Sequence, residues 1–192
     1  MTEMTYVVTD IEADGPFPGG HSMLSFASAA VGEDGTDRGH FTVNLRPLEG
    51  ATPHPRTMEW WRTQPEGWAE ATRDPQEPEE AMSSFVEWVR SLPGAAVFVA
   101  HPVAFDGGWI AWYLRRFTGV PLYDHPSEKG LTIGGLDLPS LVMGMYGWEF
   151  QQSNRCQYPE EWLGGYAHSH KALDDALGYA ALLKRLLARE PE

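Results

Sequence analysis

Residues 6–15 read Y-V-V-T-D-I-E-A-D-G, and this stretch carries the clearest fold signal in the chain. Residues 6–11 are rich in β-branched side chains and predict a buried strand. Because side chains two positions apart lie on the same face of a strand, Asp10 and Glu12 should converge where the strand ends. Burying two carboxylates is costly without a cation beside them, and no Lys or Arg lies nearby in the sequence. Taken alone, the pair also fits two solvent-exposed carboxylates at a strand end.

Strand and helix patterns alternate along the rest of the chain. Further strands are predicted at residues 22–31, 41–45, 95–100 and 131–138. Helices are predicted at residues 57–64, 78–91, 105–117, 139–146 and 171–188. Residues 13–21 are rich in glycine and proline and predict a loop, and residues 151–169 lack periodicity and are also expected to be loop. This order predicts a single domain of the α/β class over residues 1–192, with helices packed on a mixed sheet.

A third carboxylate follows the apolar run A-A-V-F-V-A at residues 95–100. The sequence H-P-V-A-F-D then leads to Asp106, near the start of the helix predicted at residues 105–117. An Asp at a helix start commonly serves as a cap or as a partner of the helix dipole, so Asp106 alone is not diagnostic. In context, it places another carboxylate close to the end of a second buried strand.

The last motif, H-K-A-L-D-D-A, begins at His170. A His and an Asp five residues apart cannot share one face of a continuous helix, so His170 should precede or begin the helix and Asp175 should lie in its early turns. The small side chains of Ala172 and Ala176 allow a close approach to the sheet, with Asp175 on the packed side. Asp174 points about 100° away, towards solvent. An ordinary capped amphipathic helix would show the same pattern.

Together, these motifs place four carboxylates at one edge of the predicted sheet. Without nearby basic residues to neutralise it, such a cluster fits hard divalent cations with oxygen ligands, Mg²⁺ or Mn²⁺. Two such ions about 3.5–4 Å apart suit phosphodiester hydrolysis, because one activates water and the other stabilises the leaving oxygen. A His beside them, with an ordinary pKa near about 6.5, can accept the proton of that water at neutral pH.

The three motifs resemble those of the DEDDh (DnaQ-like) 3′-to-5′ exonucleases in both order and spacing. D-I-E-A-D-G is similar to the first exonuclease motif, V-A-H-P-V-A-F-D to the second, commonly H-N-x-x-F-D, and H-K-A-L-D-D-A to the third. The resemblance covers about residues 6–187 and implies the ribonuclease H-like fold, a mixed five-stranded sheet flanked by helices. Residues 58–61, followed by Gln64, also resemble part of a T-x-x-W-W-x-x-Q segment of some phage-type and bacterial members.

Roles for single residues follow from this resemblance. It implies that Asp10 bridges two metal ions, that Glu12 and Asp175 bind the tighter one, and that Asp106 holds the other. His170 would be the general base, and His168 is its rival for that role. Contacts with the 3′-terminal nucleotide are implied for Ala13, Asp14, Gly15, Phe17 and Phe105.

The chain also departs from the family pattern. Pro102 replaces the Asn that is usual in the second motif, which removes a side-chain contact there. Residues 121–169 show no pattern from which substrate choice can be predicted. Trp109 and Trp112 are three residues apart on the predicted helix and are expected in the core, whereas Phe17 in the glycine-rich loop is a candidate for stacking on a terminal base.

The composition limits the possible functions. A net charge of -13 argues against a protein that coats long nucleic acid through a basic surface, but it does not exclude an enzyme that acts at a chain end. The single cysteine excludes an internal disulfide and a Cys-rich zinc site. Neither a signal peptide nor an apolar run of about 20 residues is apparent, so a cytoplasmic protein that does not bind membranes is expected.

The resemblance implies release of nucleoside 5′-monophosphates from the 3′ end of single-stranded RNA or DNA, or from short oligonucleotides. Two alternatives remain open: a catalytically inactive nucleic-acid-binding module, and an endonuclease or other phosphodiesterase on the same fold. The sequence has no motif for the 2′-hydroxyl contact that separates RNA from DNA. A homodimer is also compatible with the sequence.

Overall fold

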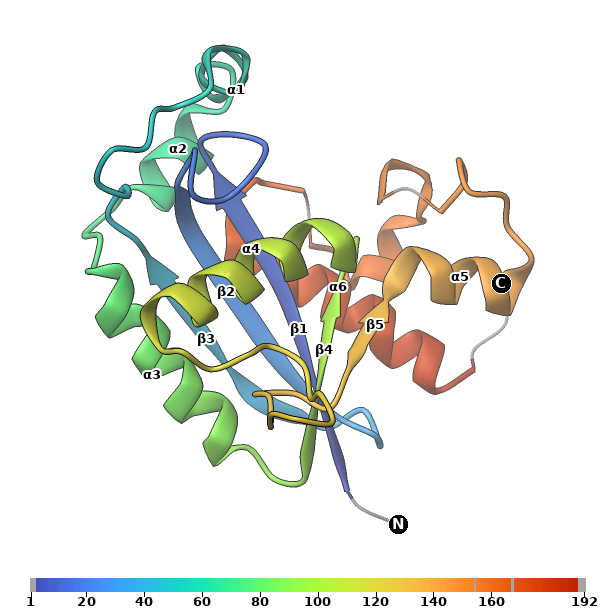
Figure 1. Cartoon of the computed structure of the whole chain (residues 1–192). Helices are drawn as coiled ribbons and strands as arrows, with labels where there is room; N and C mark the ends of the chain where they lie inside the picture. Colours follow the sequence, from blue (N-terminus) through green and yellow to red (C-terminus); the bar gives the residue numbers. More distant parts are fainter. Residues whose placement is uncertain (1–2, 154, 167, 190–192) are drawn as a thin grey trace.

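The computed structural model describes residues 3–153, 155–166 and 168–189. Within these residues, a five-stranded sheet in the order β3-β2-β1-β4-β5 forms the centre of the molecule (Figure 1). The strands are β1 (Met4–Ala13), β2 (Met23–Gly32), β3 (Asp37–Asn44), β4 (Ala95–Ala100) and β5 (Gly135–Asp137). β1, β2 and β3 form an antiparallel meander, whereas β4 pairs parallel with both β1 and β5. The predicted mixed five-stranded sheet is therefore confirmed.

Helices cover both faces of this sheet. They are α1 (Pro55–Trp61), α2 (Pro65–Ala71), α3 (Pro78–Ser91), α4 (Val103–Phe117), α5 (Leu138–Tyr146) and α6 (Ala172–Leu187), with the 3₁₀ helices η1 (Arg155–Gln157) and η2 (Glu160–Leu163) before α6. α3 and α4 pack on the face that contains Val7, and α5 and α6 pack on the face that contains Val8. Figure 1 shows α4 in front of the sheet and α6 behind it. Every residue of β2 is buried, because a strand covered on both faces has no solvent side.

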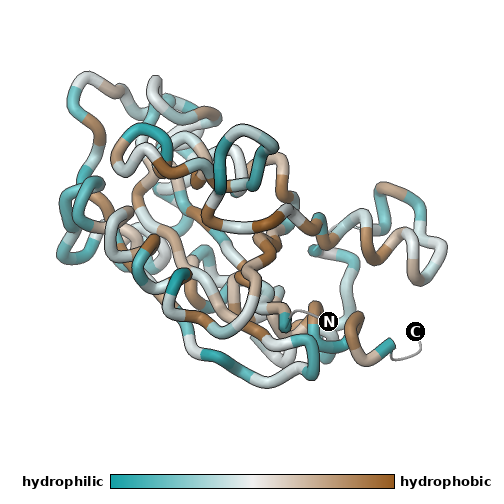
Figure 2. The backbone as a smooth tube through the Cα atoms, turned by 60° about the horizontal axis from the view of Figure 1, so that its bottom comes forward, coloured by the Kyte–Doolittle hydropathy of each residue, from teal (hydrophilic) through white to brown (hydrophobic). Residues whose placement is uncertain are grey.

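Hydropathy follows this layering. Figure 2 shows hydrophobic segments running through the interior and hydrophilic segments in many of the outer turns. Trp109 on α4 is buried in the core, as predicted, and Trp112 is half-buried, with its ring beside Gly19. In the part of the chain that the structure describes, no helix is both long enough and apolar enough to cross a bilayer.

The helix predicted at residues 57–64 corresponds to α1, which covers residues 55–61, whereas α2 at residues 65–71 was not predicted. α1 ends at Trp61, and α2 begins at Pro65 after Gln64, whose backbone is not helical. A proline fixes its own φ at a helical value and restricts the residue before it, so Pro65 both ends the first helical stretch and begins the next. α1 and α2 with the turn between them, residues 55–71, are called the α1–α2 hairpin below.

The strand predicted at residues 131–138 is also shorter in the structure, where β5 covers only Gly135–Asp137. Leu131 and Thr132 instead pair with their own loop: the Leu131 amide donates to the Pro121 carbonyl at 2.8 Å, and the Thr132 amide donates to the Leu122 carbonyl at 2.9 Å. These backbone groups are therefore satisfied within residues 121–132 and are not available for extending the strand.

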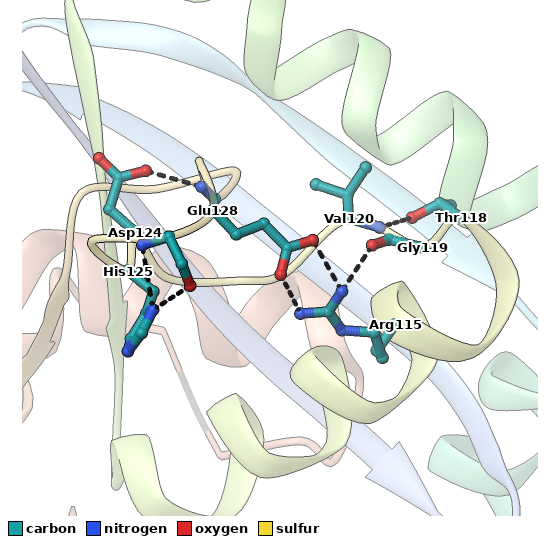
Figure 3. A network of polar contacts seen from close by, with 9 residues as sticks. Arg115, Thr118, Gly119, Val120, Asp124, His125 and Glu128 are labelled. Atoms are coloured by element: carbon teal, nitrogen blue, oxygen red, sulfur yellow. Dashed lines mark hydrogen bonds and ion pairs between the residues drawn. The ribbon is translucent and has the colours of Figure 1, made fainter.

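Residues 121–132 form an ordered loop that is fastened to α4 (Figure 3). The guanidinium of Arg115 donates to both carboxylate oxygens of Glu128, at 2.9 and 2.8 Å, and to the carbonyl of Gly119 at 3.0 Å. Within the loop, the Asp124 carboxylate accepts a hydrogen bond from the Gly130 amide at 2.7 Å. Arg115 is thus engaged in a surface contact and does not line the candidate site described below.

Residues 154 and 167 of the loop predicted at residues 151–169 lie outside the described residues. The described part contains the two 3₁₀ helices, and its aromatic rings stack with one another and with Trp148. The rings of Trp148 and Trp162 stack with centroids 5.1 Å apart, and those of Tyr158 and Trp162 stack at 6.2 Å. Trp162 and Tyr158 are buried in the hydrophobic core that α6 forms with the sheet face containing Val8. Contacts between aromatic rings therefore determine the conformation of this segment. Such contacts do not recur at a fixed spacing, so the sequence pattern did not predict them.

Candidate active site

Four acidic side chains meet at one end of the central strands. Asp10 and Glu12 come from the end of β1, Asp106 from the first turn of α4, and Asp175 from the first turn of α6. β1 and β4 are parallel neighbours, so the helix that follows β4 begins beside the end of β1. A direct contact joins α4 to β1 there: the Asp106 carboxylate accepts a hydrogen bond from the Ile11 amide at 3.2 Å. The structure therefore brings together all four predicted carboxylates.

Three of these carboxylates form the tightest group. Asp10, Glu12 and Asp175 each offer an oxygen atom, and these atoms all lie within 4.8 Å of one another. Asp175 is fully buried and Glu12 nearly so, whereas Asp10 is partly exposed. Neither oxygen of Asp175 accepts a well-formed hydrogen bond from the described residues. Clustered, under-bonded carboxylates of this kind fit a hard divalent cation with oxygen ligands.

The four acidic residues are called the carboxylate cluster below, and burial raises the pKa of Asp10, Glu12 and Asp106. The pKa of Glu12 rises to about 8, through burial and then the neighbouring charges of Asp175 and Asp106. Burial raises the pKa of Asp106 to about 7, and burial together with Asp106 and Glu12 raises that of Asp10 well above its usual value. Without a cation, the cluster therefore retains protons near neutral pH.

A pH-dependent stability follows for the metal-free protein. The pKa values of Glu12 and Asp106 lie near 4 in the unfolded chain, and at about 8 and about 7 in the folded one. Between roughly pH 4 and 8 the folded state binds more protons, so the free energy of unfolding should fall as pH rises. Saturating Mg²⁺ should oppose that fall, because it stabilises the charged carboxylates.

Melting temperatures measured from pH 5 to 8.5, in EDTA and in Mg²⁺, check this expectation. Glu12→Gln removes one titrating group and should give a shallower pH dependence in EDTA. Parallel curves with and without metal would contradict a cation site at these carboxylates.

Two histidines lie beside the cluster. His170 precedes α6, as its spacing from Asp175 predicts, and its backbone has φ +52°. His168 Nδ1 is 3.0 Å from an oxygen of Asp175, and the rings of His168 and His170 are 4.1 Å apart. Burial, and then His168, lower the pKa of His170 below its usual value. Both imidazoles are therefore within reach of the carboxylates.

Asp174, the neighbour of Asp175, was expected to point into solvent. It is half-buried, and its carboxylate accepts a hydrogen bond from the Ser169 hydroxyl at 2.8 Å. It is not among the residues that line the cavity at the site, so it supports the turn before α6 rather than the cluster.

Arg155 is a site residue that the sequence did not reveal. It is buried, its guanidinium nitrogen lies 3.2 Å from an Asp175 oxygen, and it stacks over the Tyr179 ring at 4.9 Å. The expectation that no basic residue neutralises the cluster is therefore wrong. Arg155 is 20 positions before Asp175, in a segment without periodicity, so no sequence signal pointed to it.

A cavity of about 450 Å³ joins these groups. Asp10, Glu12 and Asp106 line it, and Asp175 lies below its surface. The other lining residues that bear on the chemistry are Phe105, Phe150, Arg155, His168, His170 and Tyr179. Pro102, which takes the place of the usual Asn, is also in the wall. Carboxylates, imidazoles and exposed aromatic rings therefore share one concave site.

Of the residues expected to contact substrate, one lines the cavity and the others do not. Phe105 lines the cavity and is 42% exposed. Ala13, Asp14, Gly15 and Phe17 do not line it. Asp14 is buried, and its carboxylate accepts a hydrogen bond from the Ser22 amide of the same loop at 2.6 Å. Gly15 lies against the His21 ring, with which the exposed Phe17 packs edge to face.

Comparison with known proteins gives one curated relative. No protein-family model matches the chain. The chain is 29% identical over 195 residues to a protein of Escherichia coli named 3′-5′ DNA exonuclease Cap18, covering 97% of this chain and 93% of the relative. The alignment therefore spans all three motifs and the segments between them.

Solved structures show the same fold. The nuclease domain of 3′hExo, a DEDDh family member bound to rAMP, matches with a TM-score of 0.67 and 11% identity, over 98% of this chain and 92% of that one. E. coli Exonuclease I in complex with a dT13 oligonucleotide matches with a TM-score of 0.71 and 16% identity, over 98% of this chain and 42% of that one. The predicted ribonuclease H-like fold, and the resemblance to DEDDh exonucleases, are confirmed.

Proposed function

We propose that this protein is a metal-dependent 3′-to-5′ exonuclease that releases nucleoside 5′-monophosphates from single-stranded DNA. The observation that carries the proposal is the convergence of Asp10, Glu12, Asp106 and Asp175 beside two imidazoles in one cavity. The name of the E. coli relative, which is similar over nearly the whole chain, supports both the direction and the choice of DNA.

Two divalent cations, Mg²⁺ or Mn²⁺, fit the donor set of the site. Asp10, Glu12 and Asp175 would hold one, and Asp106 together with Asp10 would hold the other. When bound, such ions supply an activated water and stabilise the negative charge that develops on the oxygens of the scissile phosphate. The raised pKa values of the carboxylates mean that binding releases protons.

His170 acts as the general base in this proposal. Its lowered pKa keeps the imidazole neutral at pH 7, so a ring nitrogen can accept a proton from the attacking water. The water oxygen then forms a bond to phosphorus, and the bond from phosphorus to the 3′ oxygen breaks. The products are a nucleoside 5′-monophosphate and a strand with a new 3′-hydroxyl.

The cavity also suggests how the terminal nucleotides are held. Phe150 is 79% exposed and Phe105 42% exposed, and both line the cavity. Exposed rings beside a nuclease site offer stacking surfaces for bases, and each stacked base contributes about 1–3 kcal/mol. The negative net charge of the chain is consistent with such local recognition of a strand end.

Phe150→Ala should therefore raise KM for single-stranded DNA by about 5- to 150-fold, with a smaller change in kcat. Ile133→Ala serves as the matched control, because Ile133 is 49% exposed but does not line the cavity. Steady-state kinetics on a labelled oligonucleotide check this. An unchanged KM in Phe150→Ala would remove Phe150 from the substrate path.

Circular and linear single-stranded DNA of the same sequence separate the proposal from its alternatives. An exonuclease degrades the linear form to mononucleotides and leaves the circle intact. Cutting of the circle would establish an endonuclease. Binding of both forms without cleavage, unchanged in Asp10→Ala and without metal, would establish a nucleic-acid-binding module.

A further inference from the structure

The backbone of His170 lies in the left-handed region, with φ +52°. That conformation is uncommon for a residue other than glycine, and it persists only where the surroundings hold it. A side chain that accepts a proton from water must also keep a fixed position, since a shift of about 1 Å can cost about a hundredfold in rate. The contacts that hold His170 therefore bear directly on turnover.

The α1–α2 hairpin supplies two of these contacts. From α1, the Trp60 ring packs edge to face on the His170 imidazole, with centroids 4.7 Å apart and planes at 86°. From α2, the backbone at Gly67 lies so close that a Cβ there would be 2.8 Å from the His170 carbonyl and 3.2 Å from its Cβ. One contact reaches the imidazole and the other reaches the main chain.

The α1–α2 hairpin is itself fixed to the strand that carries the carboxylates. Trp61 is buried, and its indole Nε1 donates to the Ala13 carbonyl, directly after Glu12, at 3.0 Å. Trp61 also packs on Trp68 of α2, with ring centroids 5.5 Å apart. At the far end, the Asn44 side chain donates to the carbonyl of Glu70 at 2.8 Å. A path of direct contacts thus joins β1 to His170.

We propose that the α1–α2 hairpin positions His170 over the carboxylate cluster, with Trp60 and Gly67 as positioning residues. Trp60 fixes the plane of the imidazole, and Gly67 provides the gap that lets the chain at His170 lie against α2. Neither residue lines the cavity, so both act through His170. The inference rests on the proposed function, which assigns proton transfer to His170.

Three variants of Trp60 and Gly67 test the proposal. Trp60→Ala should lower kcat for single-stranded DNA by about tenfold to a hundredfold, while KM and the metal concentration for half-maximal rate stay near wild-type values. Trp60→Phe keeps a ring edge against the imidazole and should restore most of kcat. Gly67→Ala forces the backbone at His170 to move and should lower kcat without touching the aromatic contact.

Two control variants remove similar groups elsewhere. Trp88→Ala removes another half-exposed tryptophan, which packs on Phe41 and Phe85 and does not line the cavity. Gly144→Ala adds a methyl group on α5, where a Cβ meets no atom within 4 Å. Both should retain wild-type kcat, whatever they do to the melting temperature.

The position of His170 can be observed without turnover by NMR of the imidazole ring protons, assigned by comparison with His170→Ala. The ring current of Trp60 should shift these signals, and the shift should disappear in Trp60→Ala. The proposal is overturned if Trp60→Ala and Gly67→Ala keep wild-type kcat while His170→Ala is inactive, a result that leaves the proposed function intact. Full activity of His170→Ala would instead remove the assignment of His170 on which the proposal rests.

Discussion

Asp10→Asn is expected to lower kcat by at least about 10³-fold while making the metal-free protein more stable. In the proposed site Asp10 would hold both cations, so its loss should remove several kcal/mol of transition-state stabilisation, and about 4 kcal/mol corresponds to about 10³-fold in rate. Without metal, the same change removes one of four crowded carboxylates, whose mutual repulsion and burial raise the Asp10 pKa. Activity and stability should therefore change in opposite directions.

Asp174→Asn is the matched control for this change. It removes one negative charge at the start of α6, next to Asp175, but its carboxylate contacts Ser169 and does not line the cavity. Its kcat should stay close to the wild-type value. Turnover measured in Mg²⁺ and melting in EDTA give the two readouts. If Asp10→Asn kept wild-type turnover, the carboxylate cluster would not be the catalytic centre.

The second large effect is expected for His170→Ala, which should lower kcat by about 10²–10⁴-fold, the usual contribution of a general base. Its metal affinity should change little, because the carboxylates remain in place. His168→Ala should behave differently, since His168 contacts Asp175 directly at 3.0 Å. The main effect of His168→Ala should be on the Mg²⁺ concentration that gives half-maximal rate, with a smaller loss of kcat at saturating metal.

Kinetics of the two histidine variants across a range of Mg²⁺ concentrations separate these roles. A large loss of kcat in His168→Ala, with near-normal turnover in His170→Ala, would transfer the general base to His168. The ring centroids of His168 and His170 are 4.1 Å apart, and both imidazoles lie beside the same carboxylates. Position alone therefore does not decide which of them accepts the proton.

The carboxylate cluster could be predicted because each member depends on a local rule. Asp10 and Glu12 share a face through the two-residue period of a strand, and β1 is regular through both positions. Asp106 and Asp175 each lie in the first turn of a helix that follows a loop. The spacing of five between His170 and Asp175 correctly placed the His before the helix.

The rest of the site depends on packing between distant segments, for which the sequence has no period. Arg155 comes from a segment shaped by stacked aromatic rings, and Trp60 reaches His170 across more than 100 positions of the chain. α2 was missed because the helix predicted at residues 57–64 stops directly before Pro65, at which α2 begins. Asp14 is expected to contact substrate, and its carboxylate accepts a hydrogen bond from the Ser22 amide of the same loop, which the sequence did not predict. For Arg155 and Trp60, contacts between distant segments decided the outcome.

The central claim is best tested with 5′-labelled single-stranded DNA and RNA of matched sequence, incubated with Mg²⁺ or Mn²⁺, with EDTA and Asp10→Ala as controls. The account predicts a ladder of DNA shortened stepwise from the 3′ end, absent in both controls, with the RNA degraded more slowly. Intact DNA in every lane would contradict it.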